Sequence, residues 1–234
     1  MRIALMVAKL FYVVPYFLIK LIRYAKKGQH KEAYAFIRKM CIRANKAGRV
    51  KIEGSGMENI PSENGFILFP NHQGMFDVLA MLETCEAPFS IIYKKEIKDI
   101  ILVKQIFDAL KAIPLDREDL RQNLNVIHEM TFRVENGENF VIFAEGTRSK
   151  NGNKLNEMKA GSFKSAVKAK CPIIPVALID SFRPFDEKSI RKLKVKVNYL
   201  KPLLYEEYKD MSTKEIAEEV KKRIEECIKD HSSD

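Results

Sequence analysis

The chain has 234 residues, a formal net charge of +10, four histidines and four cysteines. Its length fits one domain with a sizeable core. The cysteines form no C-x-x-C pair, and the histidines are scattered along the chain. A disulfide scaffold and a metal site are therefore not expected, and the thiols are expected to be free, as in a reducing compartment.

The excess positive charge lies at the N-terminus, in a region that is also rich in apolar residues. Residues 1–60 carry 13 Lys and Arg against 3 Glu, whereas the rest of the chain carries 28 charges of each sign. Ile3 to Ile22 is apolar except for Lys9 and Lys20. Its longest uncharged run, Leu10 to Ile19, is half of the ~20 residues that span a membrane. The stretch predicts a helix that dips into a membrane without crossing it. A secretory signal is the competing interpretation, but basic residues follow where a cleavage site would lie.

A second helix is predicted from Lys31 to Ala44, with an apolar face beside a cationic face. The apolar face comprises Ala33, Phe36, Ile37, Met40, Cys41 and Ala44. Such a helix is typical of the surface of an anionic membrane. The alternative is a helix packed on the body of the protein, with a solvated basic face. We predict a two-helix membrane-docking segment over residues 1–47 and a second domain over residues 48–234.

After Gly54 the pattern changes to apolar strands that alternate with helices. The predicted strands are residues 50–53, 66–69, 89–93, 112–115, 140–143, 173–178 and 195–200. The predicted helices are residues 75–84, 97–110, 118–135, 161–169 and 214–229. Mostly apolar strands in alternation with helices predict an α/β fold, in which a mixed, largely parallel sheet is covered by helices on both faces.

A histidine and an aspartate follow the apolar strand at residues 66–69, in the segment PNHQGMFD at residues 70–77. On one continuous helix, His72 and Asp77 would point about 140° apart. They can meet if His72 lies in a turn, where Gly74 lets the backbone bend, and Asp77 lies in the first turn of the next helix. Asp77 could then hold one imidazole nitrogen and leave the other free to take a proton.

A second polar cluster, AEGTRS at residues 144–149, follows another apolar strand. Arg148 offers a planar fork of donors, Gly146 lets backbone N–H groups approach a ligand, and Thr147 adds a hydroxyl. Together these groups suit a phosphate. The alternative is a solvated turn that contains a Glu145–Arg148 ion pair.

The two clusters resemble signature blocks of the glycerolipid acyltransferases, the 1-acylglycerol-3-phosphate acyltransferase family. That family carries N-H-x4-D, a basic block, F-P-E-G-T-R-S and a proline-rich apolar block. This chain has all four in order, in Asn71-His72 to Asp77, in Lys94-Lys95-Glu96 with Leu115-Asp116-Arg117, in Phe143 to Ser149, and in Cys171 to Val176. Val50 to Gly54 and Lys159-Ala160-Gly161 fit as well, so the resemblance covers roughly residues 49–200.

The resemblance implies that a fatty acyl group passes from an acyl thioester, on acyl-carrier protein (ACP) or coenzyme A (CoA), to the sn-2 hydroxyl of lysophosphatidic acid. The site residues that it implies are His72 and Asp77 for catalysis, Arg148, Arg117, Lys95, Thr147 and Gly146 for the phosphate, and Glu145 and Asn71 for orienting the substrate. It implies no metal or other cofactor. With the basic, apolar N-terminus, it also implies a place on the cytoplasmic face of the cell membrane, against an anionic surface.

Two other functions remain open from the sequence. One is an acyltransferase of the same superfamily with another acceptor, such as glycerol-3-phosphate, a lysophospholipid or a lipid without phosphate. The other, more distant, is a nucleic-acid-binding protein, which the basic N-terminus favours. Against it, that charge is interleaved with apolar residues and no nucleic-acid-binding motif occurs, so a nucleic-acid partner is not expected.

Overall fold

The computed structural model describes residues 1–97, 102–116 and 119–231 of the chain. Within these residues, seven strands form one sheet in the order β1-β7-β6-β2-β5-β3-β4. The strands are β1 (Val50–Ser55), β2 (Ile67–Pro70), β3 (Phe89–Lys94), β4 (Ile113–Leu115), β5 (Asn139–Val141), β6 (Ile173–Ile179) and β7 (Leu193–Tyr199). Neighbouring strands in this sheet are parallel except for β6 and β7. The predicted mixed, largely parallel sheet is confirmed.

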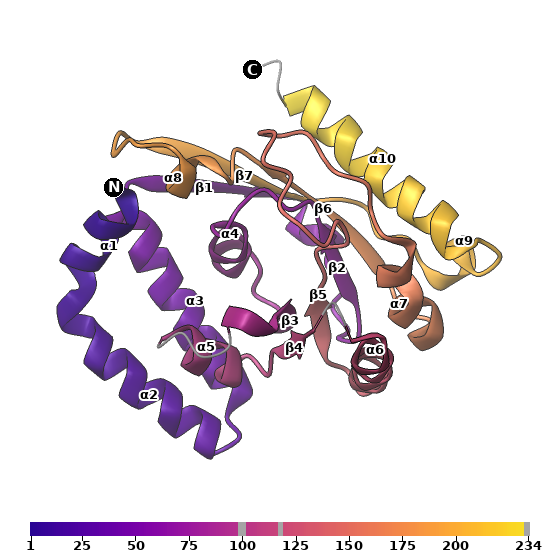
Figure 1. Cartoon of the computed structure of the whole chain (residues 1–234), viewed down its shortest axis with the longest axis horizontal. Helices are drawn as coiled ribbons and strands as arrows, with labels where there is room; N and C mark the ends of the chain where they lie inside the picture. Colours follow the sequence, from indigo (N-terminus) through magenta and orange to yellow (C-terminus); the bar gives the residue numbers. More distant parts are fainter. Residues whose placement is uncertain (98–101, 117–118, 232–234) are drawn as a thin grey trace.

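Helices cover both faces of the sheet (Figure 1). One face carries α4 (Asp77–Thr84), α5 (Val103–Ala109) and the N-terminal helices, and the other carries α6 (Leu120–Glu135), α7 (Lys164–Ala169) and α10 (Thr213–His231). The short helices α8 (Arg183–Asp186) and α9 (Tyr205–Tyr208) complete this part of the chain. In β2, Leu68 belongs to the first core, whereas Ile67 and Phe69 belong to the second. The strand is buried on both faces, as the unbroken apolar run predicts.

The predicted apolar N-terminal helix consists of two helices joined by a short 3₁₀ turn. They are α1 (Arg2–Leu10) and α2 (Val14–Lys26), and α3 (His30–Ala47) follows. Arg2 is buried, and its guanidinium donates hydrogen bonds to the carbonyl oxygens of Gly48 and Arg191. A Cβ atom on Gly48 would collide with the side chain of Met6, which shows how closely α1 packs against the end of α3. The start of the chain is thus fixed to the body.

The apolar face of α3 is covered by the protein itself. Ala33, Tyr34 and Ile37 are buried in the core on one face of the sheet, and the Tyr34 hydroxyl donates a hydrogen bond to the carbonyl of Cys85. The interpretation of α3 as an interfacial helix is therefore wrong for this face, because α3 packs on α4, β1 and the first two helices. The alternative, a helix packed on the body, describes it.

The outer face of α1 and α2 carries the exposed apolar side chains instead. They are Ile3, Val7, Phe11, Tyr12, Tyr16, Ile19 and Ile22, each between 43% and 70% exposed. By length and composition alone, Arg2–Lys26 could cross a membrane. However, Phe17 and Leu21 on its inner face are buried against the body, so only one side of these helices is free.

Candidate active site

The residues singled out in the sequence meet at the carboxyl edge of the sheet. β2 leads into His72, its parallel neighbour β5 leads towards the turn at residues 144–149, and the next parallel strand, β3, leads into Lys95. Neighbouring strands lie about 4.8 Å apart, so these segments line up along one edge. Arg117, predicted at the end of β4, lies outside the described residues.

His72 and Asp77 contact each other directly. Nδ1 of His72 lies 2.7 Å from Oδ2 of Asp77, and this bond leaves Nε2 as the ring nitrogen that can accept a proton. His72 lies in the turn after β2, and Asp77 is the first residue of α4, as the spacing predicts. The ring of Phe143 packs against the imidazole, with centroids 4.2 Å apart. The pair has the geometry of a base and its orienting carboxylate.

The carboxylate of Asp77 is fully buried and is held by the turn that carries His72. It accepts hydrogen bonds from the backbone N–H groups of Gln73, at 2.8 Å, and Gly74, at 3.0 Å. A Cβ atom on Gly74 would lie 3.3 Å from Cα of Phe182, closer than most real contacts allow. The glycine therefore permits the close approach of the chain after β6, rather than a left-handed backbone.

Glu145 joins the two sequence clusters to each other. One carboxylate oxygen accepts a hydrogen bond from the backbone N–H of His72 at 2.6 Å, and the other accepts one from Asn156 at 2.7 Å. The side chain is 2% exposed, and burial raises the pKa of the Glu145 carboxyl above its usual value. Among the described residues it forms no ion pair with Arg148, so the solvated Glu145–Arg148 pair considered from the sequence is not formed.

Asn71 and Gln73 tie the same turn to β6. The buried amide of Asn71 accepts a hydrogen bond from the N–H of Leu178 at 2.7 Å and donates one to its carbonyl at 3.0 Å. Gln73 donates to the same carbonyl, at 2.9 Å, and to Asn153 at 2.8 Å. In the structure the Asn71 amide connects the end of β2 to β6, and its role in orienting the substrate stays a prediction.

Arg148 and Thr147 present an exposed surface beside this buried framework. The backbone N–H of Ser149 donates to the carbonyl of His72 at 2.9 Å, which holds the turn against the histidine. Gly146 has a φ of +73°, a left-handed conformation that favours glycine. Within the described part of the chain, the guanidinium of Arg148 forms no hydrogen bond or ion pair. It is a cation that a ligand can reach, on a turn that is hydrogen-bonded to the backbone of the predicted base.

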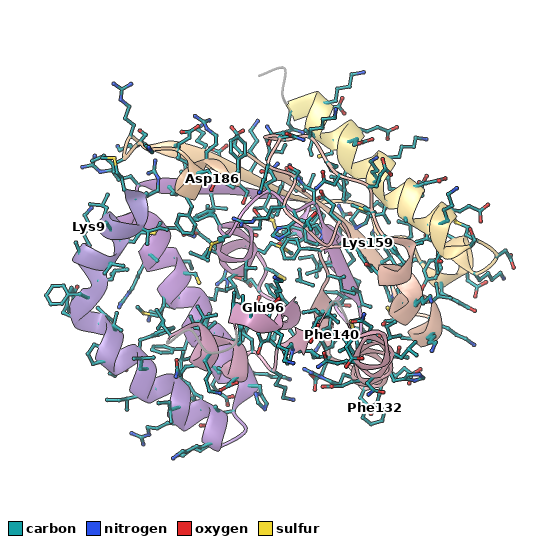
Figure 2. The ribbon with its side chains drawn as sticks, viewed as in Figure 1. Lys9, Glu96, Phe132, Phe140, Lys159 and Asp186 are labelled. Carbon is teal, nitrogen blue, oxygen red and sulfur yellow. The ribbon has the colours of Figure 1, made fainter. Side chains whose placement is uncertain are left out.

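Lys159 is a candidate site residue that the sequence did not single out. Its side chain crosses Gly146: a Cβ atom built on that glycine would lie 2.9 Å from Nζ. Its backbone N–H donates to the carbonyl of Ala144 at 2.9 Å, and Figure 2 labels it on the segment that leads towards α7. Its ammonium has no carboxylate partner in the described ranges. The sequence signal that could have found it is the place of Lys159 in the Lys159-Ala160-Gly161 block, which is part of the resemblance to the family.

Lys95 lies farther along the same edge. It begins the 3₁₀ turn after β3, its side chain is 57% exposed, and its Nζ lies 3.5 Å from a carboxylate oxygen of Asp116. Two clefts, of about 490 and 400 Å³, lie away from this edge, around Lys111 and Glu138, near the amino ends of β3 and β5. Among the described residues no three His, Cys, Asp or Glu side chains are grouped to hold a metal ion.

Several 1-acyl-sn-glycerol-3-phosphate acyltransferases are similar in sequence to part of this chain. A chloroplastic 1-acyl-sn-glycerol-3-phosphate acyltransferase of Brassica napus is 29% identical over 158 residues, which cover 67% of this chain and 44% of that protein. The enzyme of that name from Borreliella burgdorferi is 30% identical over 56% of this chain and 52% of its own length. The one from Helicobacter pylori is 26% identical over 70% and 74%. The chain thus spans about half the length of the first two of these relatives.

A solved structure and a family model complete these comparisons. The crystal structure of the 1-acyl-sn-glycerophosphate (LPA) acyltransferase PlsC from Thermotoga maritima superposes with a TM-score of 0.76 over 97% of this chain and 98% of that one. At 23% identity, this likeness establishes the fold. The family model described as Acyltransferase matches residues 51–179, which are more than half of the chain and include every described candidate site residue. The resemblance seen in the sequence is confirmed, and the chain belongs to the acyltransferase family.

Proposed function

We propose that the protein transfers a fatty acyl group from an acyl thioester to the free sn-2 hydroxyl of lysophosphatidic acid, giving phosphatidic acid. One observation carries the proposal: Arg148, exposed and unpaired among the residues that the structure describes, lies on a turn that is hydrogen-bonded to the backbone of His72. A base and a phosphate-binding cation on two turns that are hydrogen-bonded to each other suit an acceptor with a hydroxyl and a phosphate on one short glycerol backbone. The names of the relatives support the same acceptor.

The reaction follows from the His72–Asp77 geometry. Nε2 of His72 removes the proton of the acceptor hydroxyl as its oxygen attacks the thioester carbonyl carbon. Asp77, bonded to Nδ1, holds the imidazole in the required tautomer and stabilises the imidazolium. The carbon–sulfur bond then breaks, and the imidazolium returns its proton to the leaving thiolate. The products are the ester and the free thiol, without an acyl-enzyme intermediate.

The phosphate of the acceptor is proposed to bind at the exposed turn. Arg148 supplies a bidentate fork, and Gly146 and Thr147 supply a backbone N–H and a hydroxyl. Lys159, which crosses Gly146, adds a second positive charge. Lys95 would extend this positive surface along the edge, from β5 to β3. Arg117, outside the described residues, is proposed as a further phosphate ligand. Glu145 acts indirectly, since its buried carboxylate fixes the backbone of His72.

An acceptor and donor screen tests this proposal. The purified protein is given lysophosphatidic acid, glycerol-3-phosphate, lysophosphatidylcholine or monoacylglycerol, each with acyl-ACP and with acyl-CoA. We expect phosphatidic acid to form fastest, and the donor that works is read from the same screen. Preferential acylation of glycerol-3-phosphate or lysophosphatidylcholine would assign the other acceptor of the same superfamily.

The exposed face of α1 and α2 is proposed to bind the cytoplasmic surface of the cell membrane, where the acceptor resides. Burial of apolar surface contributes roughly 25 cal/mol per Å², and each nearby Lys or Arg adds about 1 kcal/mol on an anionic surface. Because Phe17 and Leu21 are buried on the inner face, these helices are expected to lie along the membrane rather than cross it.

Vesicle flotation tests this membrane surface without unfolding the protein. Removing residues 1–44 would uncover core residues that these helices cover, such as Phe89, whose ring packs on that of Tyr34, so surface substitutions are the cleaner test. Phe11→Ser combined with Ile19→Ser should weaken binding to anionic vesicles by roughly tenfold or more. Phe132→Ser is the matched control, because Phe132 is 65% exposed on α6 and points away from the body (Figure 2). An equal loss of vesicle binding in the double variant and in Phe132→Ser would refute the proposed surface. So would binding of the protein to nucleic acid in place of vesicles.

A further inference from the structure

Ser181 places a hydroxyl on the buried carboxylate of Asp77. Its Oγ donates a hydrogen bond to Oδ1 of Asp77 at 2.6 Å, and the side chain is 0% exposed. The residue follows β6, directly after Asp180, which adopts a left-handed backbone with a φ of +60°. That turn brings the Ser181 side chain against Asp77, the first residue of α4. A donor that follows β6 thus meets a carboxylate that lies 104 residues earlier in the chain.

The two oxygens of this carboxylate have different partners. Oδ2 accepts from Nδ1 of His72 and from the backbone of Gln73 and Gly74. Oδ1 accepts from Ser181 and, at 3.1 Å, from the Gly74 N–H that it shares with Oδ2. Ser181 is therefore the one side-chain donor on Oδ1 among the described residues. Together with the longer bond from Gly74, this hydroxyl holds Oδ1 and so restricts the plane in which Oδ2 faces the imidazole.

The backbone of Ser181 is anchored to the same turn. Its N–H donates to Oε1 of Gln73 at 2.7 Å, while the amide nitrogen of Gln73 donates to Leu178 and Asn153. The backbone that carries the hydroxyl is therefore held in place. The hydrogen bond from this hydroxyl to a charged acceptor is stronger in a buried site than it would be in water. Within the described ranges, one other carboxylate is bonded to this turn: that of Glu145, which accepts from the backbone N–H of His72 and forms no hydrogen bond with Asp77.

We propose that Ser181 is a positioning residue of the reaction, which holds the Asp77 carboxylate in the plane that orients His72. The inference rests on the proposed acyl transfer. Because Ser181 is fully buried, it acts through Asp77 and not through either substrate. Its loss should lower kcat and leave the KM of both substrates unchanged, whereas general loosening of the site would raise KM as well.

Four variants measure this role. Ser181→Ala should lower kcat by roughly tenfold, the effect of losing one hydrogen bond to a charged group. Ser181→Thr and Ser181→Val have nearly the same volume, so the difference between them reports the hydroxyl, and threonine should retain more activity than valine. Ser165→Ala, which removes another fully buried hydroxyl, on α7, should leave kcat unchanged. Thermal unfolding of each variant verifies that it folds.

A double-mutant cycle separates positioning from packing. In the Asp77→Ala background, Ser181→Ala should have no further effect on kcat, because the group that Ser181 holds is gone. A tenfold loss that persists in this background would overturn the inference. So would equal kcat for wild type and Ser181→Ala, or equal kcat for the threonine and valine variants.

A spectroscopic readout keeps the inference testable apart from activity. The proton between Nδ1 of His72 and Asp77 is observed in protein labelled with ¹⁵N-histidine and assigned by its loss in His72→Gln. Its resonance should move in Ser181→Ala and Ser181→Val, and hold its position in Ser181→Thr. If the wild type acylates no acceptor, the proposed function fails, yet this measurement still decides whether Ser181 orders the pair. An unchanged resonance in all three variants would refute it.

Discussion

The two ends of the candidate site are built in opposite ways. At the end formed by β2 and β6, Asn71, Asp77 and Ser181 are buried, and their side chains are held by other groups of the protein. At the end formed by the turn after β5, Arg148 and Lys159 are exposed, and their charges have no carboxylate partner in the described residues. The first end is satisfied internally, and the second presents its donors to solvent.

This difference follows from what each end does in the proposed reaction. A base must keep one orientation while charge develops on it, and hydrogen bonds in a dry site hold it there without reorganisation. A phosphate site must exchange its ligand, so its cations stay hydrated until the ligand arrives. Substitutions at the buried end should therefore act on kcat. Those at the exposed end should act on the KM of the acceptor.

His72→Ala should give the largest effect, because it removes the general base. We expect kcat to fall by ~10²–10⁴-fold, with the fold intact, since His72 lies at the carboxyl edge and not in the core. Asp77→Asn should lose somewhat less, because it leaves the imidazole in place without its carboxylate. Rates from single-turnover acylation, with circular dichroism as the folding control, measure both. Wild-type turnover in His72→Ala would end the base hypothesis.

Arg148→Ala should chiefly raise the KM for lysophosphatidic acid, by roughly tenfold, because a phosphate contact contributes equally to ground state and transition state. Arg148→Lys should be a poor substitute, since a lysine lacks the planar fork. Steady-state kinetics with each substrate varied in turn measure the effect. A rise in the donor KM with an unchanged acceptor KM would move Arg148 to the other substrate.

Lys159→Ala should give the smallest of these effects, a rise in the acceptor KM of roughly two- to fivefold, because an exposed ammonium is a screened point charge. The effect should shrink as salt is added. Lys168→Ala, on the exposed side of α7, is the matched control, because the three atoms nearest a Cβ on Gly146 all belong to Lys159 and Lys168 is likewise exposed. If the two lysine variants behave alike, the contact with Gly146 has no role in binding.

Local patterns predicted much of the fold and the centre of the site. The unbroken apolar runs located the strands because buried parallel strands need apolar residues on both faces. The five-residue spacing of His72 and Asp77, with a turn before the helix, predicted their contact, which the structure contains. Both are properties of short segments, so one sequence suffices to see them.

Partners far apart in the sequence could not be predicted in this way. The Ser181 hydroxyl meets Asp77 only because β6 lies beside β2, and the amide of Asn71 meets Leu178 for the same reason. A serine after an apolar strand carries no local signal of such a bond. The apolar face of α3 was misassigned for a related reason: periodicity shows that a face is apolar and does not show what covers it.

The most direct test of the two-ended site compares two acceptors that differ only in the phosphate. The ratio of kcat/KM for lysophosphatidic acid to that for monoacylglycerol is measured in wild type, His72→Ala and Arg148→Ala, with the acylated position identified by mass spectrometry. The ratio should favour lysophosphatidic acid strongly in wild type. The ratio should stay the same in His72→Ala, although both rates fall. It should decrease strongly in Arg148→Ala, because that variant binds the phosphate of lysophosphatidic acid less well. A ratio that collapses in His72→Ala, or survives in Arg148→Ala, would contradict the division of the site into a buried base and an exposed phosphate turn.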